Sequence, residues 1–313
     1  MSTSATGIKK AIRYFGFAVI GLLFLLALVA VWIYLASESR LQKEYEFSAE
    51  VDAPRAALIE RGRQLAMSRG CADCHGDDFG GKIMLDEMPF ARVVGTNLTP
   101  PSAGIEPRVR HEQLYRALRH GVGADSKALL LMPSGSFSKL SLEEIEALSA
   151  YLNTLPSVDH ALPDSQMGPL GRALLVTGKL KDFLSVEVID HAKPVVAAPP
   201  PVGSIDYGRH AAQLCMGCHG ADFGGGPMTH GGPSAPPAAN LTPDVTGLAA
   251  WSEADFIASM REGKRPDGSE IDGKYMPWRA IGQASDDELK SIYRYLQSVP
   301  SVHRSMKDAS RQD

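Results

Sequence analysis

Two six-residue stretches decide the fold: Cys71-Ala-Asp-Cys74-His75-Gly76 and Cys215-Met-Gly-Cys218-His219-Gly220. They lie 144 residues apart, and further matched segments follow each of them in the same order. These pairs are Phe79-Gly80-Gly81 with Phe223-Gly224-Gly225, Asn97-Leu98-Thr99-Pro100 with Asn240-Leu241-Thr242-Pro243, and Met132-Pro133 with Met276-Pro277. Since the period is too long for a solenoid, the sequence predicts a tandem duplication of one domain.

The Cys-x-x-Cys-His pattern is typical of the covalent attachment of a c-type haem. Two thiols one helical turn apart add to the two vinyl groups, and the histidine that follows ligates the iron. The alternatives are a structural zinc site, a disulfide and thiol redox chemistry. Zinc requires the two motifs to converge, and a redox pair needs neither the histidine nor its duplication. We therefore predict two haem c groups, which use all four cysteines: Cys71, Cys74 and His75 for the first, Cys215, Cys218 and His219 for the second.

A matched methionine in each copy is the candidate for the sixth iron ligand. His75 and Met132 are 57 residues apart, as are His219 and Met276. A thioether is a soft, neutral ligand that favours ferrous iron, and the proline that follows each methionine stiffens its loop. Six other methionines have no equally spaced partner, so we interpret them as core filler: Met67, Met84, Met88, Met167, Met228 and Met260.

Each proximal histidine also needs an acceptor for its second ring nitrogen. The carbonyls of Pro89 and Pro233, each 14 residues past its histidine, are the candidates. Asn97 and Asn240 are expected to lock the following loop through side-chain bonds to backbone. The histidines without a twin are interpreted as surface or locally bonded residues: His111, His120, His160, His191, His210, His230 and His303.

The N-terminal segment carries 21 consecutive uncharged residues, from Phe15 to Leu35. A helix of this length spans roughly 30 Å, the thickness of the hydrocarbon core of a bilayer. Basic residues precede the run, and Trp32 and Tyr34 stand near its other end, so the tail is expected in the cytoplasm and the rest outside. The alternative is a cleaved signal peptide, which has a shorter apolar region and a small-x-small cleavage site. We predict an uncleaved single-pass anchor in the inner membrane.

The predicted fold class is all-α, with an N-terminal transmembrane helix and two tandem haem domains. Capping boxes open a last helix in each copy, at Ser141 to Glu144 and Ser285 to Glu288. Short helices are expected before the cysteine motifs, at 56–69 and 207–214. The expected boundaries are 1–40 for tail and anchor, 52–158 for the first domain, 159–203 for a bridge with a proline-rich end and 204–303 for the second domain.

Composition and charge narrow the function. The chain has 313 residues, with 44% apolar and 22% charged side chains, which is typical of folded protein. The net charge is −4, whereas nucleic-acid-binding proteins are usually basic. No nucleic-acid partner is therefore expected. The predicted anchor makes the membrane an expected partner of the protein.

At these residues the chain resembles the class I c-type cytochromes, and most of all the membrane-anchored dihaem electron-transfer cytochromes. The residues that carry the resemblance are the two cysteine–histidine motifs, the two methionines and the Asn-Leu-Thr-Pro segments. It covers roughly residues 52–157 and 204–303. The resemblance implies that the first and last helices of each domain cross, with Gly62 and Tyr151, or Gly208 and Tyr295, in contact.

Two irons that each bind a histidine and a methionine leave no open position for a substrate. The predicted function is therefore electron transfer in the periplasm, without catalytic residues. A dihaem cytochrome c peroxidase is the alternative, since it needs an iron whose sixth position opens, and a haem sensor is disfavoured because no signalling domain is visible. The expected redox partners are a dehydrogenase, a quinol-oxidising complex or a terminal oxidase. The chain also resembles cytochrome subunits of periplasmic alcohol and sugar-acid dehydrogenases, which usually carry three haems.

Overall fold

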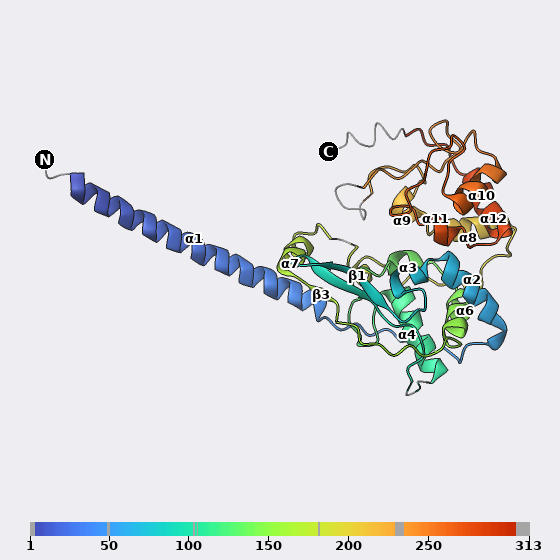
Figure 1. The fold of residues 1–313 in the computed structure, drawn as a ribbon, viewed down its shortest axis with the longest axis horizontal. Helices are drawn as coiled ribbons and strands as arrows, with labels where there is room; N and C mark the ends of the chain where they lie inside the picture. The colour runs from blue at the N-terminus through green and yellow to red at the C-terminus, as the bar shows by residue number, and fades with distance from the viewer. Residues whose placement is uncertain are drawn as a thin grey trace.

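The computed structural model describes residues 4–48, 51–102, 104, 106–180, 182–228 and 235–304. The protein has two mostly helical lobes, and a long helix, α1 (Ser4–Leu41), projects from the first of them (Figure 1). The first lobe contains η1 (Ala56–Leu58), α2 (Ile59–Ser68), α3 (Cys71–His75), β1 (Lys82–Glu87), β2 (Ala91–Gly95), α4 (Pro107–His120), α5 (Ser134–Phe137) and α6 (Leu142–Leu152). The second contains α8 (Ile205–Ala212), α9 (Met216–His219), α10 (Glu253–Glu262), α11 (Trp278–Ile281) and α12 (Asp286–Leu296). The predicted predominance of helix is confirmed.

The first and last helices of each lobe cross at a glycine, as the resemblance implied. A Cβ built on Gly62 of α2 would lie 1.8 Å from the carbonyl oxygen of Ala147 and 2.8 Å from the Cβ of Tyr151. In the second lobe the Cβ of an alanine at position 208 would meet the Ser291 carbonyl oxygen at 1.9 Å. Only glycine lets the backbones approach this closely, which fixes the crossing of α2 with α6 and of α8 with α12.

Both predicted capping boxes form. The Ser141 hydroxyl accepts from the N–H of Glu144 at 3.2 Å, and the Glu144 carboxylate accepts from the N–H of Ser141 at 2.9 Å. Ser285 and Glu288 repeat the arrangement at the start of α12. These bonds satisfy N–H groups that the first turn of a helix leaves without a partner.

The bridge contains more structure than the sequence indicated. Its first part forms β3 (Gln166–Met167), α7 (Pro169–Val176) and η2 (Ser185–Glu187). β3 extends the antiparallel hairpin to the sheet order β1-β2-β3, with Ala91 paired to Met167. Phe183, Leu184 and Val186 share a buried cluster with Ala91 and Val93 of β2, so this part of the bridge packs on the first lobe. The sheet was not predicted, because the period-two pattern in residues 82–95 is short and β1 is mostly exposed.

The proline-rich end of the bridge, residues 194–201, contains neither helix nor strand. It runs past the first turn of α6, where the carbonyls of Val196 and Ala197 accept from the N–H groups of Leu142 and Glu143. The bridge therefore completes the cap of a helix in the first lobe before it enters the second.

Two sets of charged side chains join the lobes. Arg61 of α2 bonds the Glu288 carboxylate at 2.8 Å and the Tyr207 hydroxyl at 2.9 Å, and Tyr207 itself donates to Glu288. We call these three residues the Arg61 cluster. In the opposite direction, the Nε2 of His210 lies 2.7 Å from the Glu144 carboxylate. Each capping-box glutamate thus binds the first helix of the other lobe, and both carboxylates are buried.

Candidate haem sites

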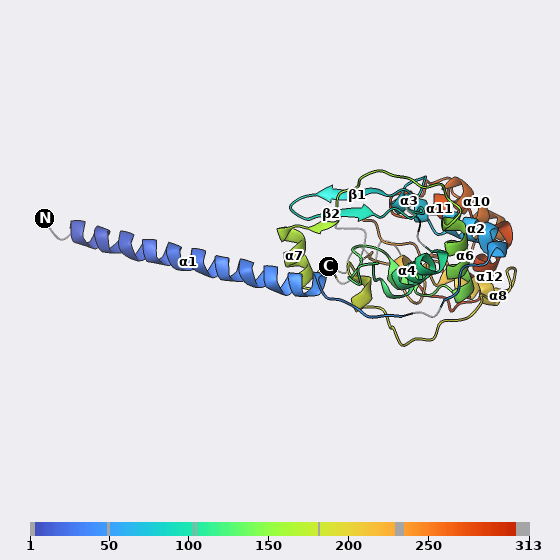
Figure 2. The same ribbon diagram turned by 90° about the horizontal axis from the view of Figure 1, so that it is seen from below.

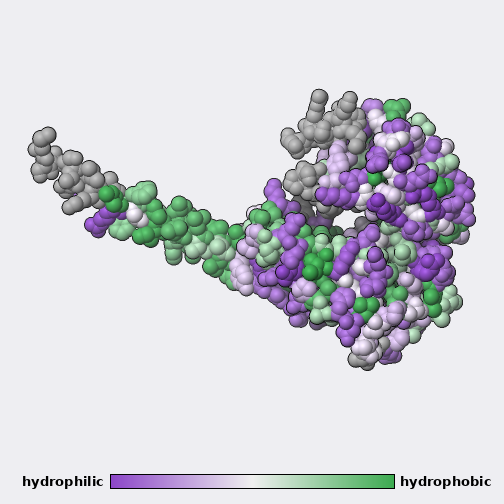
Figure 3. Space-filling model, in the orientation of Figure 1, coloured by the Kyte–Doolittle hydropathy of each residue, from purple (hydrophilic) through white to green (hydrophobic). Residues whose placement is uncertain are grey.

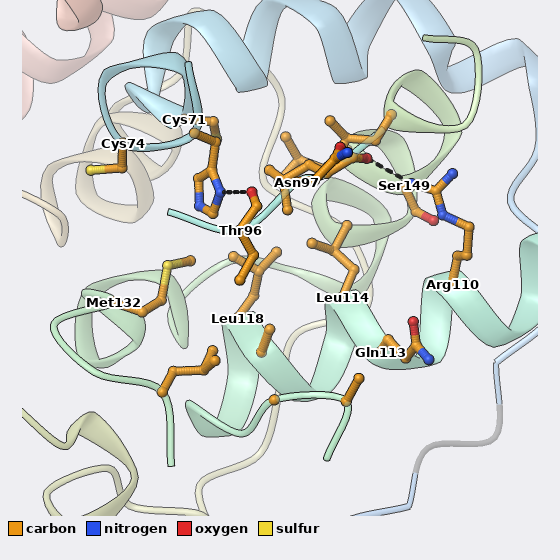
Figure 4. Close-up of a pocket in the computed structure, with 18 of the residues that line it drawn as sticks. Cys71, Cys74, Thr96, Asn97, Arg110, Gln113, Leu114, Leu118, Met132 and Ser149 are labelled. Atoms are coloured by element: carbon orange, nitrogen blue, oxygen red, sulfur yellow. Dashed lines mark hydrogen bonds between the residues drawn. The ribbon is translucent and has the colours of Figure 1, made fainter. Parts of the chain in front are cut away.

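The first cysteine motif forms a single helical turn with a glycine at each end. Gly70 precedes α3 with φ 70° and Gly76 follows it with φ 84°, conformations that favour glycine. The turn brings both cysteines and His75 to the wall of a cavity of about 460 Å³. Met132, in the loop before α5, lines the same cavity. Figure 4 shows Met132 reaching from the opposite wall toward the side that carries Cys71 and Cys74.

The second motif forms a similar turn, with Cys215 as its first residue and α9 after it. Its cavity measures about 590 Å³ and is lined by Cys218, His219 and Met276. Cys215 is not part of that lining and packs against the core of the second lobe. Seven of the eight predicted site residues therefore line the cavity of their own lobe, and Cys215 does not.

The acceptors predicted for the two histidines are wrong. The Nδ1 of His75 lies 2.7 Å from the carbonyl oxygen of Thr96, and the Nδ1 of His219 lies 2.7 Å from that of Ala239. Since a carbonyl only accepts, each Nδ1 carries the proton and Nε2 keeps its lone pair. The Pro89 carbonyl instead accepts from the N–H of Leu170, and Pro233 lies outside the described residues. Burial lowers the pKa of both histidines, which favours the neutral, ligating form.

The repeated asparagines hold these carbonyls in place, as expected. The amide of Asn97 donates to the Val158 carbonyl at 2.7 Å, and its oxygen accepts from the N–H of Thr99 at 2.8 Å. Asn240 makes the matching bonds, to the Val302 carbonyl at 2.6 Å and from Thr242 at 2.9 Å. The acceptor for each histidine is the residue just before this asparagine. The Asn-Leu-Thr-Pro repeat was therefore the signal that could have located it.

The two pairs of cysteines lie in different lobes, and none of the four forms a disulfide. Burial raises the pKa of Cys71 to about 12 and that of Cys215 to about 11, which disfavours the thiolate form that zinc binds. A structural zinc site requires thiolates gathered from both motifs. Among the described residues no group of three or more His, Cys, Asp or Glu side chains is arranged to hold a metal ion. The zinc alternative therefore has no support from the geometry.

The unmatched methionines divide into two groups. Met167 and Met260 are buried and Met67 packs against the core of the first lobe, as expected of core filler, and Met228 and Met260 line the second cavity. Met84 and Met88 do not fit that interpretation, because both are exposed on the hairpin. The unmatched histidines were expected to lie at the surface or to form local bonds, and the structure fits that expectation better. His111 binds the Asp52 carbonyl, His120 binds His191, and His230 lies outside the described residues.

Both cavities fit a haem. Their volumes lie in the range of 300–1,000 Å³ that is usual for cofactor sites. Apart from the motif residues, the walls are largely apolar: Leu114, Leu118, Leu148 and Leu152 in the first, Leu248, Trp251, Phe256 and Met260 in the second. Each offers a neutral imidazole nitrogen, a thioether and at least one thiol. This donor set suits a covalently attached iron porphyrin.

The two sites meet at the contact between the lobes. A Cβ built on Gly70, next to Cys71, would lie 3.3 Å from the Cβ of Ala280 in α11. A Cβ on Gly217, between the second pair of cysteines, would lie 3.2 Å from the hydroxyl of Ser136 in α5. Each cysteine motif therefore touches the helix that follows the methionine of the other lobe, and Figure 1 shows α3 facing α11.

Comparison with known proteins agrees with the geometry. The chain is 29% identical over 280 residues to the cytochrome c subunit of a quinone alcohol dehydrogenase from Gluconacetobacter polyoxogenes, which covers 79% of this chain and 57% of the relative. It is 26% identical over 282 residues to a gluconate 2-dehydrogenase cytochrome c subunit from Pantoea cypripedii, covering 83% and 62%. The chain thus spans little more than half of these two relatives.

A third relative is similar in length. It is a dihaem c-type cytochrome from Cereibacter sphaeroides, 24% identical over 279 residues, with 81% of this chain and 90% of the relative covered. The cytochrome c family model matches residues 59–156 and again 205–300, which together make more than half of the chain. The chain therefore belongs to the cytochrome c family and carries two covalently bound haem c groups, one in each domain.

Proposed function

We propose that this protein is the membrane-anchored electron-transfer subunit of a periplasmic dehydrogenase complex. The observation that carries the proposal is the pair of haem cavities in contact through the motifs that line them. Two relatives named above are cytochrome c subunits of dehydrogenases. None of the three relatives described is a peroxidase, so that alternative has no support from them. The alternative partners are a quinol-oxidising complex as the electron donor and a terminal oxidase as the electron acceptor.

We assign the iron ligands to His75 and Met132 in the first site and to His219 and Met276 in the second. Each imidazole is oriented by the bond that its Nδ1–H donates to the carbonyl of Thr96 or Ala239, and each methionine lines the same cavity as its histidine. When bound, the haem supplies a one-electron ferric/ferrous couple. A histidine and a methionine that both ligated the iron would leave it no open position for peroxide, which suits electron transfer.

The anchor is the second part of the proposal. Ile12–Leu41 is long and apolar enough to cross a membrane, and its spanning window is not buried in the protein. Its last turns pack on the first lobe, where Ser37 is fully buried and Arg40 forms an ion pair with Glu187. A leader that is removed has no need of such contacts, so they support an anchor that stays. Protease added from the periplasmic side should digest the haem domains, and protected domains would contradict the topology.

The ligand assignment is tested by a redox-titrated visible spectrum of the detergent-extracted protein. Two covalent, low-spin haems with the far-red band of a methionine–ferric bond are expected. Met132→Ala and Met276→Ala should each convert one haem to an open or water-ligated form and lower its potential, with Met84→Ala as the exposed control. If either variant keeps the spectrum and potential of the unmodified protein, that ligand is wrong. Rapid consumption of peroxide by the half-reduced protein would favour the peroxidase alternative.

The dehydrogenase partner is tested in membranes of the native cells. Addition of an alcohol or a sugar acid should reduce the two haems of this chain in membranes, and not in the purified subunit. Reduction by a quinol alone, with no response to any dehydrogenase substrate, would favour a quinol-oxidising complex as the electron donor.

A further inference from the structure

The end of the anchor helix determines which part of the protein lies in the lipid headgroup layer. The uncharged run ends at Leu35, but α1 continues to Leu41. Each helical residue rises about 1.5 Å, and the headgroup layer on one side of a bilayer is about 5–7 Å thick. Residues 36–40 therefore cross this layer, and any element that packs on them lies at the same depth.

Helix α7 is that element. Arg172 donates to the Ser37 hydroxyl at 2.9 Å and pairs with Glu38 at 2.7 Å, and its guanidinium lies 4.8 Å from the centre of the Tyr34 ring. From the other side, Arg40 donates to the carbonyl of Leu175 at 2.8 Å. Figure 2 shows α7 across the C-terminal end of α1. These contacts attach α7 to the anchor over more than one helical turn.

The turn of the β1–β2 hairpin lies beside the start of α7. The N–H of Leu170 donates to the Pro89 carbonyl at 3.1 Å, and the N–H of Gly168 donates to the Phe90 carbonyl at 2.8 Å. Two apolar side chains are left exposed there, Leu170 at 49% and Met88 at 50%. Figure 3 shows hydrophobic surface continuing from the anchor onto the adjoining end of the first lobe.

We propose that Leu170 and Met88 form a second membrane contact, which enters the outer-leaflet lipid surface beside the anchor. Apolar side chains at the headgroup boundary are stabilised by leaving water, as in interfacial helices. The contact is continuous with the span of α1, so the occupant is lipid. With two contacts and the Arg172 bonds between them, the first haem domain has one orientation on the membrane. The proposal rests on the anchor proposed above.

The test uses the full chain with its haems in phosphatidylcholine vesicles. The vesicles contain a trace of one of two photoactivatable lipids, with the carbene precursor at the headgroup or deep in the acyl chain. Labelled peptides are mapped by mass spectrometry. The deep probe should label residues 15–35. The headgroup probe should label peptides that contain Leu170 and Met88 several-fold more than the peptide with Val245, which is 85% exposed in the second lobe.

Two variants test the second membrane contact, one at the contact and one control far from it. The double variant Leu170→Asp with Met88→Asp should lose most headgroup-probe labelling of these two peptides, while deep-probe labelling of α1 is unchanged. Val245→Asp should alter neither. If α1 is labelled but Leu170 and Met88 are labelled no more than Val245, the second contact is refuted and the anchor stands. If the deep probe fails to label α1 as well, both proposals are wrong.

Discussion

Replacement of Arg61 by methionine should separate the two haem domains. The substitution keeps an unbranched apolar side chain but removes the charge that faces Glu288. That carboxylate is 3% exposed, and the Arg61 guanidinium is its cationic partner across the lobe contact. Loss of one partner of a buried ion pair costs about 3–5 kcal/mol. Because Tyr207 still donates to Glu288, we expect the lower end of this range, about 3 kcal/mol.

An exposed ion pair on α12, the helix that carries Glu288, provides the control. Arg294 of α12 pairs with Glu253, and the side chains of the two residues are 53% and 32% exposed. Such a pair contributes about 0.2–1 kcal/mol. In a domain of about 100 residues, 1 kcal/mol corresponds to about 4–8 °C in melting temperature. Arg61→Met should therefore lower the first calorimetric transition of the full-length protein by roughly 10 °C or more, and Arg294→Met by a few degrees. Equal shifts for the two variants would refute the role given to the Arg61 cluster.

The same cluster predicts a dependence on acid. Burial alone would raise the pKa of Glu288, but the bonds from Tyr207 and Arg61 outweigh it and lower the pKa from 4.5 to about 2. A folded-state pKa below the ordinary value stabilises the protein above pH 4.5, and this contribution is lost as the pH falls toward 2. The melting difference between Arg61→Met and the unmodified protein should therefore shrink across that window. A difference that stays constant would contradict the assignment of the charge.

Three further predictions follow from single positions. Gly62→Ala should lower the stability of the first domain by about 2 kcal/mol, because overpacking against the backbone outweighs the gain in helix propensity. Gly135→Ala is the control and should not lower it, since a Cβ at position 135 would have no atom within 4 Å. Equal melting temperatures of the two variants would contradict the close crossing. Asn240→Ala leaves the Val302 carbonyl and the Thr242 N–H without their partner. It should lower the free energy of unfolding, measured with denaturant, by about 2 kcal/mol or more and perturb the spectrum of one haem. An unchanged free energy of unfolding would exclude the role of Asn240 in holding the loop. His120 stacks on the ring of Phe47, with 4.1 Å between the ring centres, and burial lowers the pKa of His120 to about 4. The contribution of the neutral imidazole to stability is therefore lost as the pH falls from 6.5 to 4, and the melting temperature of the first domain should fall more in that window than it does in His120→Gln; equal losses would contradict this role.

The sequence predicted what each domain needs for itself. The thiols, the histidine and the methionine recur at fixed spacing because each copy must attach its own haem. The helix-crossing glycines recur for a similar reason, since the two backbones approach to the distance that only glycine permits. The carbonyls that orient the histidines were missed, because any residue supplies a carbonyl and its side chain carries no signal. Only the asparagine next to them marks the place.

The apolar part of the bridge, from Pro169 to Ile189, indicates that it packs on a domain, but the hairpin and the choice of domain could not be predicted, for a different reason. Residues 82–87 expose most of their side chains, so the strand lacks the alternation of buried and exposed residues that marks a strand in a sequence. Ala91 and Val93 are buried by Met167 and Phe183, which come from the bridge more than 70 residues later. Nothing in either segment alone indicates that the other covers it.

The contact between the domains shows why a comparison of the two copies cannot find it. Arg61 and Tyr207 occupy equivalent positions, each just before a crossing glycine, yet both bond the same carboxylate, Glu288. The twin of that carboxylate, Glu144, is bound by His210 instead. Residues that meet across two facing copies must be complementary, so twin positions there diverge. A search for equal residues at equal spacing recovers the haem sites and the two capping-box glutamates, and it discards Arg61 and His210, which bond these glutamates across the contact.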